Sequence, residues 1–272
     1  MRKVKLGFSN SIYNDFCLPL DEIIAKGKRI GYDGLELNPE ASPRAIDVSA
    51  IKRALGENEF EIAAIGTKTA YLKYGSYLAS PLEERREFVL HYVEDCCRLA
   101  EGLNCSIVQL GIALQGSRLE EDKYTARKRL IAGLKEICET ASDRGITILV
   151  EPLNRFLGQL LNTFDEASEI VNAVGTPNIK LMGDLFHMNI EERSIEDSIR
   201  KSAELLKYLH VNDSNRLAPG EGHLNFEKIL SALNAISYSG YITVEIIPKP
   251  SPDDALTKSI RYLKELGKEI PL

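Results

Sequence analysis

Short apolar runs of strand length recur along this sequence at nearly regular intervals, and they constrain the fold more than any other feature. We expect eight β-strands, over residues 4–8, 34–37, 62–65, 106–110, 146–150, 179–183, 206–210 and 241–245. Dividing 272 residues by eight gives 34 residues per repeat, a length that suits one strand followed by one helix. The spacing therefore predicts an α/β protein with a parallel sheet.

Helical patterns fill the intervals between these runs. Residues 81–103 carry apolar side chains at about 3.6-residue spacing, with acidic residues in the first turn. Thr163 precedes another such pattern, which Asp165 and Glu166 open, so we expect it to be the N-cap. No linker rich in Pro, Gly or Ser divides the chain. We predict a single (β/α)8 TIM barrel over residues 1–272 and not a doubly wound open sheet.

The composition, with 44% apolar and 27% charged residues, is typical of a soluble globular protein. No apolar run approaches the roughly 20 residues of a membrane helix, and the N-terminus does not look like a secretory signal. The five cysteines are odd in number and follow no disulfide or zinc spacing, which indicates the reduced cytoplasm: Cys17, Cys96, Cys97, Cys105 and Cys138. We expect Cys96 and Cys97 to be buried in a helix.

The charge of the chain argues against nucleic acid as the main partner. The net charge is −6 and the pI is near 5.5, whereas phosphate neutralisation needs a basic face. The sequence also has no Gly-rich phosphate loop of the P-loop or dinucleotide-binding kind. We therefore expect a small-molecule ligand and no nucleotide cofactor.

Four residues of types that commonly bind metal ions lie at the ends of the last four predicted strands: Glu151, Asp184, His210 and Glu245. The carboxyl ends of the strands meet at one mouth of a (β/α)8 barrel, so these side chains should converge. Three carboxylates and a neutral imidazole would repel one another there unless a divalent cation held them together. The pattern therefore predicts a metal enzyme.

Each of these residues also has a structural interpretation. A single glutamate after a strand, such as Glu151, is usually solvated, and a single histidine such as His210 usually lies in the core with its N–H satisfied. Glu245 is different, because it sits in the apolar run YITVEII, where an unpaired charge would be costly. Taken together, the set favours the metal-binding interpretation.

Two further polar residues are expected near the same mouth. His187 follows Asp184 by three residues in a tight strand-to-loop segment, and it either ligates the cation or binds substrate beside it. Arg216 lies six residues beyond His210 in a loop, where a guanidinium could hold a sugar oxygen, a carboxylate or a phosphate, or form a surface salt bridge. His91 falls in a helical pattern, and we expect it to be structural.

The motifs of the last four strands resemble the ketose 3-epimerases of the D-tagatose and D-psicose type, which belong to the xylose isomerase-like barrel superfamily. The resemblance rests on EPLNR, GDLFHMNIEE, HVNDSNRLAPGEGHLNF and VEII, at residues 151–155, 183–192, 210–226 and 244–247. The N-terminal half matches more loosely, through FSNSI near residues 8–12 and AIGTKTAYL near residues 64–72. In its layout of strands and helices, the resemblance covers the whole barrel.

This resemblance implies a role for each site residue. Glu151, Asp184, His210 and Glu245 would bind one divalent ion, namely Mn²⁺, Co²⁺ or Mg²⁺, with Zn²⁺ as a further option. Glu151 and Glu245 would also act as the acid/base pair of a C3 epimerisation through an enediolate. His187 and Arg216 would bind substrate oxygens, and dimers or tetramers are common in this family.

One position departs from the family pattern. Epimerases of this group usually carry a glutamate that contacts the substrate two residues after the Arg of the NR dipeptide, but here that position is Leu157. A missing polar contact leaves a substrate hydroxyl unpaired or implies a different substrate. The departure concerns the identity of the sugar more than the metal site.

The four ligands alone do not separate the reactions of this superfamily. Aldose–ketose, inosose and hydroxypyruvate isomerases, dehydratases and sugar-phosphate epimerases can share them, and so could a non-catalytic metal- or sugar-binding barrel. An abasic-site endonuclease resembling endonuclease IV is disfavoured, because it needs more histidines. At three positions where that endonuclease would have metal ligands, this chain has Gln109, Ser214 and Arg216.

Overall fold

The eight predicted strands are all present and form a closed barrel. The computed structural model describes residues 4–16 and 18–269, and in it each strand is hydrogen-bonded to its neighbours in chain order. The strands are β1 (Lys5–Ser9), β2 (Gly34–Leu37), β3 (Glu61–Gly66), β4 (Ile107–Leu110), β5 (Thr147–Val150), β6 (Ile179–Asp184), β7 (Leu206–Val211) and β8 (Tyr241–Val244). Every boundary lies within one residue of its predicted position. The predicted (β/α)8 fold class is therefore confirmed.

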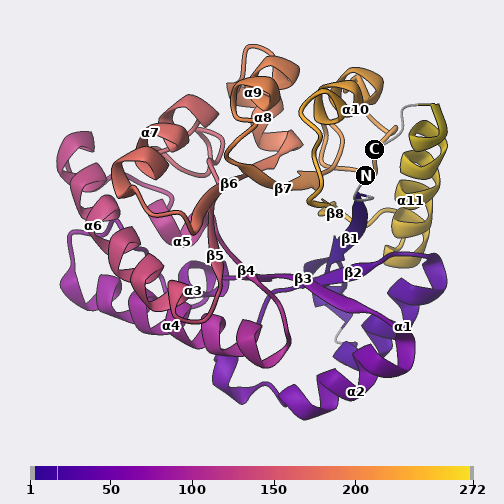
Figure 1. Cartoon of the computed structure of the whole chain (residues 1–272), viewed down its shortest axis with the longest axis horizontal. Helices are drawn as coiled ribbons and strands as arrows, with labels where there is room; N and C mark the ends of the chain where they lie inside the picture. Colours follow the sequence, from indigo (N-terminus) through magenta and orange to yellow (C-terminus); the bar gives the residue numbers. More distant parts are fainter. Residues whose placement is uncertain (1–3, 17, 270–272) are drawn as a thin grey trace. The chain divides into compact units, whose positions relative to one another are not determined.

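Helices follow the strands, and the longer ones lie on the outer side of the strands (Figure 1). They are α1 (Leu20–Ile30), α2 (Val48–Asn58), α3 (Thr69–Leu72), α4 (Glu83–Gly102), α5 (Ile112–Gln115), α6 (Lys123–Ser142), α7 (Phe164–Val174), α8 (Leu185–Glu191), α9 (Ile195–Lys201), α10 (Phe226–Ala235) and α11 (Pro252–Glu269). Two 3-10 helices cover Asn10–Phe16 and Pro43–Ala45. The predicted helix over residues 81–103 corresponds to α4.

The described residues fall into two compact units. Of these residues, unit 1 comprises 4–16, 18–37, 49–63 and 183–269, and unit 2 comprises 38–48 and 64–182. The prediction of one domain over residues 1–272 stays a prediction.

Unit 1 contains the ladder β2–β1–β8–β7. Gly7 pairs with Gly34 on one side of β1, and Leu6 pairs with Ile242 on the other. Ile242 in turn pairs with Leu209 of β7. All residues of β2 and β8 are buried, as expected for parallel strands covered on both faces.

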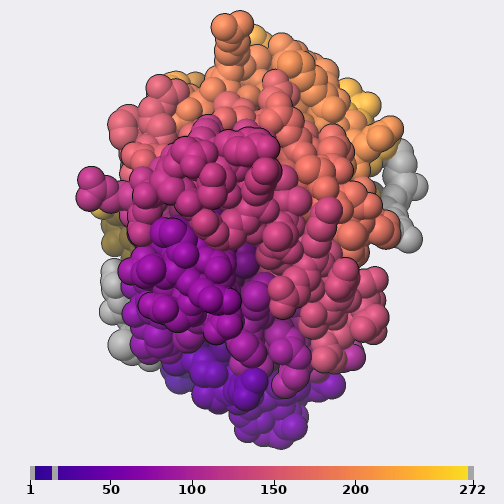
Figure 2. All heavy atoms as spheres, turned by 90° about the vertical axis from the view of Figure 1, so that its left-hand side faces the viewer, coloured from indigo at the N-terminus to yellow at the C-terminus, as the bar shows by residue number. Residues whose placement is uncertain are grey.

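Unit 2 contains the ladder β4–β5–β6, extended by the end of β3. Val108 pairs with Ile65 of β3 and with Ile148 of β5, and Ile148 pairs with Ile179 of β6. Purple to magenta residues of this unit occupy much of the face that Figure 2 shows. On α4 the apolar side bears the buried Cys96 and Cys97, as predicted. Cys17 lies outside the described residues.

Local signals in the sequence also match the structure. Thr163 caps α7, and its side chain accepts a hydrogen bond from the backbone N–H of Glu166. The Glu166 carboxylate accepts one from the backbone N–H of Thr163, which completes a capping box. Among residues 4–16 and 18–269, no helix is both long and apolar enough to cross a membrane.

Candidate functional site

Asp184 is the last residue of β6 and the N-cap of α8, and it is almost fully buried. Its Oδ1 accepts hydrogen bonds from the backbone N–H of Phe186 at 2.8 Å and from Asn212 Nδ2 at 3.0 Å. Oδ2 is also buried and accepts no hydrogen bond from the described residues. The sequence predicted a loop here, but the short helix α8 begins at Leu185, directly after Asp184, so that prediction was wrong.

His210 lies one residue before the end of β7, with 1% of its surface exposed. Its two ring nitrogens face different groups. Nε2 lies 2.5 Å from Oε2 of Glu36, a fully buried residue of β2. Nδ1 lies 3.4 Å from Glu245 Oε2 and 3.8 Å from Asp184 Oδ2. One side of the imidazole therefore faces two carboxylates that end β6 and follow β8.

Glu245 directly follows β8, and its side chain is 14% exposed. Its Oε2 accepts a hydrogen bond from Arg216 Nη2 at 2.7 Å, and the same Nη2 lies 3.4 Å from Asp184 Oδ2. The Arg216 guanidinium also packs over the ring of Phe186, with 5.1 Å between Cζ and the ring centroid. Charge on these two carboxylates is thus partly balanced by one cation.

The backbone of Arg216 adopts a conformation that is uncommon for a residue with a side chain. Its φ is +61°, in the left-handed region. The backbone N–H of Arg216 donates to Asp213 O, and Arg216 O accepts from the backbone N–H of Ile247, both at 2.8 Å. These bonds tie the loop after β7 to the segment after β8, so the guanidinium is held beside Glu245.

Asn212 connects the ends of three strands, although its pattern in the sequence gave no signal for this. It is fully buried, and its Nδ2 donates to Asp184 Oδ1 and to the backbone oxygen of Glu245, both at 3.0 Å. Its Oδ1 accepts from the backbone N–H of Phe186 at 2.8 Å. Asn212 therefore fixes the relative positions of Asp184 and Glu245.

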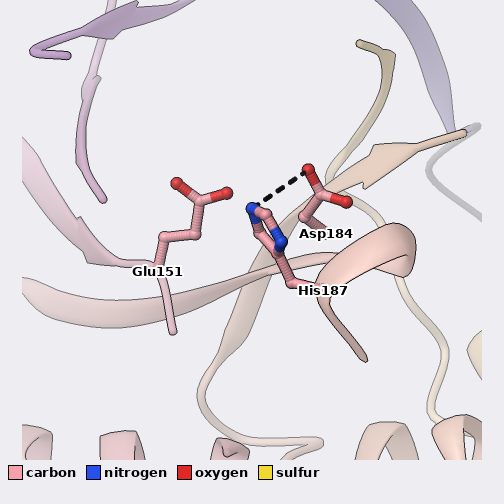
Figure 3. A group of neighbouring side chains, drawn as sticks. All are labelled: Glu151, Asp184 and His187. Atoms are coloured by element: carbon pink, nitrogen blue, oxygen red, sulfur yellow. Dashed lines mark ion pairs between the residues drawn. The ribbon is translucent and has the colours of Figure 1, made fainter. Parts of the chain in front are cut away.

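His187 lies in the first turn of α8 and is 3% exposed. Its Nε2 is 3.9 Å from Asp184 Oδ2, and Figure 3 shows the two side chains with this ion pair as a dashed line. The ring also packs against Phe186, with ring centroids 5.6 Å apart. Because α8 begins directly after Asp184, the short helix brings His187 back towards the end of β6.

Glu151 belongs to unit 2 and directly follows β5, as predicted (Figure 3). It is 7% exposed, and its backbone N–H donates to Leu110 O at 2.9 Å. Gly111 leaves space for its carboxylate, since a Cβ at that position would collide with Glu151 Oε2 and lie 3.2 Å from Cδ. The sequence analysis did not identify Gly111.

The cluster in unit 1 fits a divalent cation. One side-chain atom from each of Asp184, His210 and Glu245 lies within 4.8 Å of the other two. Burial by itself would raise the pKa of Asp184, but the nearby Arg216, His187 and His210 lower it below its usual value, so this carboxylate is ionised at neutral pH. Two carboxylates and an imidazole are a common ligand set for such ions, and the buried Oδ2 of Asp184 has capacity for one.

Glu36 is the functional neighbour that sequence reasoning missed. The segment GLEL reads as an ordinary strand, and a glutamate within it suggests one solvent-facing side chain. The contact with His210, which is 174 residues away in sequence, shows that Glu36 belongs to this cluster.

Comparison with known proteins identifies the family. A model of the family described as the xylose isomerase-like TIM barrel matches residues 24–266. D-psicose 3-epimerase of Enterocloster bolteae is 40% identical over 127 residues, which are 47% of this chain and 42% of that enzyme. The chain thus aligns with less than half of the length of this relative.

Two longer alignments cover nearly the whole chain. The 3-dehydro-D-guloside 4-epimerase of Escherichia coli is 26% identical over 253 residues, or 87% of this chain and 91% of that enzyme. The crystal structure of D-allulose 3-epimerase from Methylomonas sp. has a TM-score of 0.87 at 24% identity, covering 98% of this chain and 99% of that one. The structural similarity establishes a shared fold.

Proposed function

Because the chain belongs to the xylose isomerase-like TIM-barrel family, we propose that it is a metal-dependent sugar epimerase that inverts C3 of a ketose through an enediolate. The observation that carries this proposal is the buried cluster of Asp184, His210 and Glu245, with Oδ2 of Asp184 accepting no hydrogen bond from the described residues. The partial similarity to D-psicose 3-epimerase supports the choice of reaction.

We propose that Glu151 joins these three residues as the fourth ligand. Its support is that Glu151 follows β5 of a closed barrel and is buried, and that active sites of such barrels lie at the carboxyl ends of the strands. Mn²⁺, Co²⁺ and Mg²⁺ are the cations we propose, with Zn²⁺ as an alternative. When bound, the cation supplies positive charge beside the ketone oxygen, where negative charge develops as the α-proton leaves.

The acid/base roles fall to Glu151 and Glu245. Epimerisation needs a proton to leave from one face of the carbon and to return on the other, so two groups on opposite faces are required. Glu245 is held by Arg216 and by the backbone of the segment after β8, which fixes the carboxylate on its side of the substrate. Glu151 would serve the opposite face.

His187 and Arg216 are proposed to bind substrate oxygens. Arg216 has an exposed fraction of 24%, so its guanidinium reaches solvent beside the buried carboxylates. Its contact with the Phe186 ring and the bonds of its backbone limit the positions it can adopt. A rigid donor of this kind selects the orientation of a hydroxyl or carbonyl oxygen.

Proton NMR in D₂O tests the reaction directly. Protein reconstituted with Mn²⁺ and then freed of excess ion would be incubated with a panel of free and phosphorylated ketoses. We expect the C3 epimer together with deuterium at C3, and loss of both in Glu245→Gln. The matched control is Glu61→Gln, because Glu61 is about half exposed and forms a surface ion pair with Lys5.

A second reaction deserves the same test, because the E. coli 4-epimerase aligns over most of the chain. Proton removal beside a ketone at C3 would equally allow inversion at C4 of a 3-keto glycoside. Deuterium at C4 of such a substrate would assign this reaction, whereas label at C1 or C2 with an aldose product would assign an isomerase. Absence of exchange with every sugar, despite one bound ion per chain, would refute the substrate class.

The remaining proposals concern the cellular compartment, the binding partner and the oligomeric state. The four described cysteines are free and buried, in keeping with action in the reducing cytoplasm. A small-molecule sugar or sugar phosphate is the proposed partner, and a homodimer or homotetramer is the proposed assembly. Size-exclusion chromatography with light scattering measures the assembly.

A further inference from the structure

Glu36 is a fully buried acidic residue that lies outside the proposed ligand set and acid/base pair. It is the third residue of β2, a strand in which every residue is buried. A buried carboxylate is costly unless a strong partner compensates it. Its Oε2 lies 2.5 Å from His210 Nε2, well within hydrogen-bonding distance.

The contact spans a considerable part of unit 1. Glu36 is on β2 and His210 is on β7, and the ladder places β1 and β8 between those strands. Such a contact therefore requires both side chains to point inward from strands that are not neighbours. Local packing along one strand does not produce it.

The two nitrogens of His210 have separate environments. Nε2 faces Glu36, whereas Nδ1 faces Glu245 Oε2 at 3.4 Å and Asp184 Oδ2 at 3.8 Å. A carboxylate that accepts a hydrogen bond from Nε2–H keeps the proton on that nitrogen. The lone pair of the neutral ring then resides on Nδ1, on the side where the proposed ligands converge.

We propose that Glu36 is a positioning residue that holds the proton on Nε2 of His210 and so directs Nδ1 towards the cation. This inference rests on the proposed metal site and adds a residue to it that the ligand pattern does not contain. Carboxylates that orient a ligating histidine in this way raise its basicity and restrict its rotation. The role is indirect, since Glu36 acts through His210.

Two measurements on purified protein test the proposal. Zn²⁺ affinity is determined by competition with a chromophoric chelator for the wild type, Glu36→Leu, Glu36→Gln and the surface control Glu61→Gln. The ring nitrogens of His210 are observed by ¹H–¹⁵N NMR of the Zn²⁺ form, and assignment is feasible because the chain has 4 histidines. The second measurement reports the proton position, which a merely structural role of Glu36 would not determine.

We expect a proton on Nε2 of the wild type, shifted far downfield and protected from exchange with water. Glu36→Leu should weaken Zn²⁺ binding by about 10- to 100-fold and remove the protection. Glu36→Gln keeps a neutral acceptor, so it should recover part of the affinity and the same proton position. Glu61→Gln should match the wild type in both measurements.

Several results would overturn the role of Glu36. A wild-type signal with the proton on Nδ1 does so even if Glu36→Leu fails to fold. Wild-type affinity in a folded Glu36→Leu protein also does so, as does a loss of affinity with an unchanged, protected Nε2 proton. A wild type that binds no Zn²⁺ would instead overturn the metal site itself, so the two failures are distinguishable.

Discussion

Replacing Asp184 by Asn separates the contribution of this carboxylate to folding from its contribution to metal binding. Asn keeps an oxygen for the hydrogen bonds from the Phe186 backbone and from Asn212, and it is also a good N-cap for α8. The main change is the loss of one buried negative charge and of the unbonded oxygen Oδ2.

The structure gives the size of the effect without metal. At an effective dielectric constant of about 20, the charges of Asp184 and Arg216, 3.4 Å apart, attract by about 5 kcal/mol. Asp184 and Glu245 approach within 4.8 Å, which gives a repulsion of at least about 3.5 kcal/mol. The two terms nearly cancel, so Asp184→Asn should change the free energy of unfolding of the metal-free protein by less than about 2 kcal/mol.

The effect with metal should be larger. An ion at 100 times its Kd stabilises the wild type by about 2.7 kcal/mol, or roughly 5 °C in Tm for a chain of this size. If Asp184→Asn raises the Kd at least about 100-fold, the same ion concentration adds only about 0.4 kcal/mol. Thermal unfolding of EDTA-stripped protein, with and without Mn²⁺, measures both quantities.

The matched control is Asp253→Asn in α11, which removes a carboxylate that pairs with Lys26 and accepts a hydrogen bond from Tyr13. This variant should keep the full Mn²⁺-dependent shift. The reasoning is refuted if Asp184→Asn also keeps that shift, because Asp184 would then not be a ligand. A loss of more than about 3 kcal/mol in the metal-free variant would refute the charge balance.

Two further predictions concern stability. Gly27→Ala should lower the free energy of unfolding by about 1 to 3 kcal/mol, because the new Cβ in α1 would lie 2.7 Å from Cζ of the buried Phe8. Gly56→Ala in α2 is the control: its new Cβ meets no atom within 4 Å, so it should raise the free energy of unfolding by up to about 1 kcal/mol. Urea denaturation measures both changes. Glu166→Gln should cost about 1 kcal/mol at pH 7 by removing the 2.7 Å ion pair with Lys123 and weakening the capping box. Burial opposes ionisation of Glu166, yet the partners lower its pKa below 4.5, so this stability is present above pH 4.5 and is lost as the pH falls through the folded-state pKa. A difference from wild type that persists at pH 2 would contradict this assignment.

Much of the fold was predictable because each strand is mostly buried and reads as a short apolar run. Parallel strands covered on both faces need no polar alternation, so an interruption of the run marks the strand end. Polar residues at those ends, such as Glu151 and Glu245, stood out for the same reason. The sequence pattern alone thus predicted which residues lie at the mouth of the barrel.

Other features depend on contacts that no local pattern contains. The helix α8 has seven residues, too few to show a helical period, so the segment after Asp184 was predicted as a loop. Glu36 and Asn212 resemble ordinary strand and loop residues until their partners on other strands are known. The division into two units also has no signal in composition, since unit 1 is assembled from three separate segments.

The pairing of β1 with β8 has a consequence for the order in which the chain can fold during synthesis. Lys5 pairs with Tyr241, and 241 minus 5 leaves a separation of 236 residues, so β1 cannot pair with β8 until the residues between them have left the ribosome. Unit 2 ends at residue 182, so its ladder can form while β7 and β8 are still being made. Force-sensitive arrest peptides placed after residue 182 and after the C-terminus would detect the two events. The residues proposed to hold the metal can therefore assemble only after Glu245 has been made, and until then β1 stays unpaired on its β8 side.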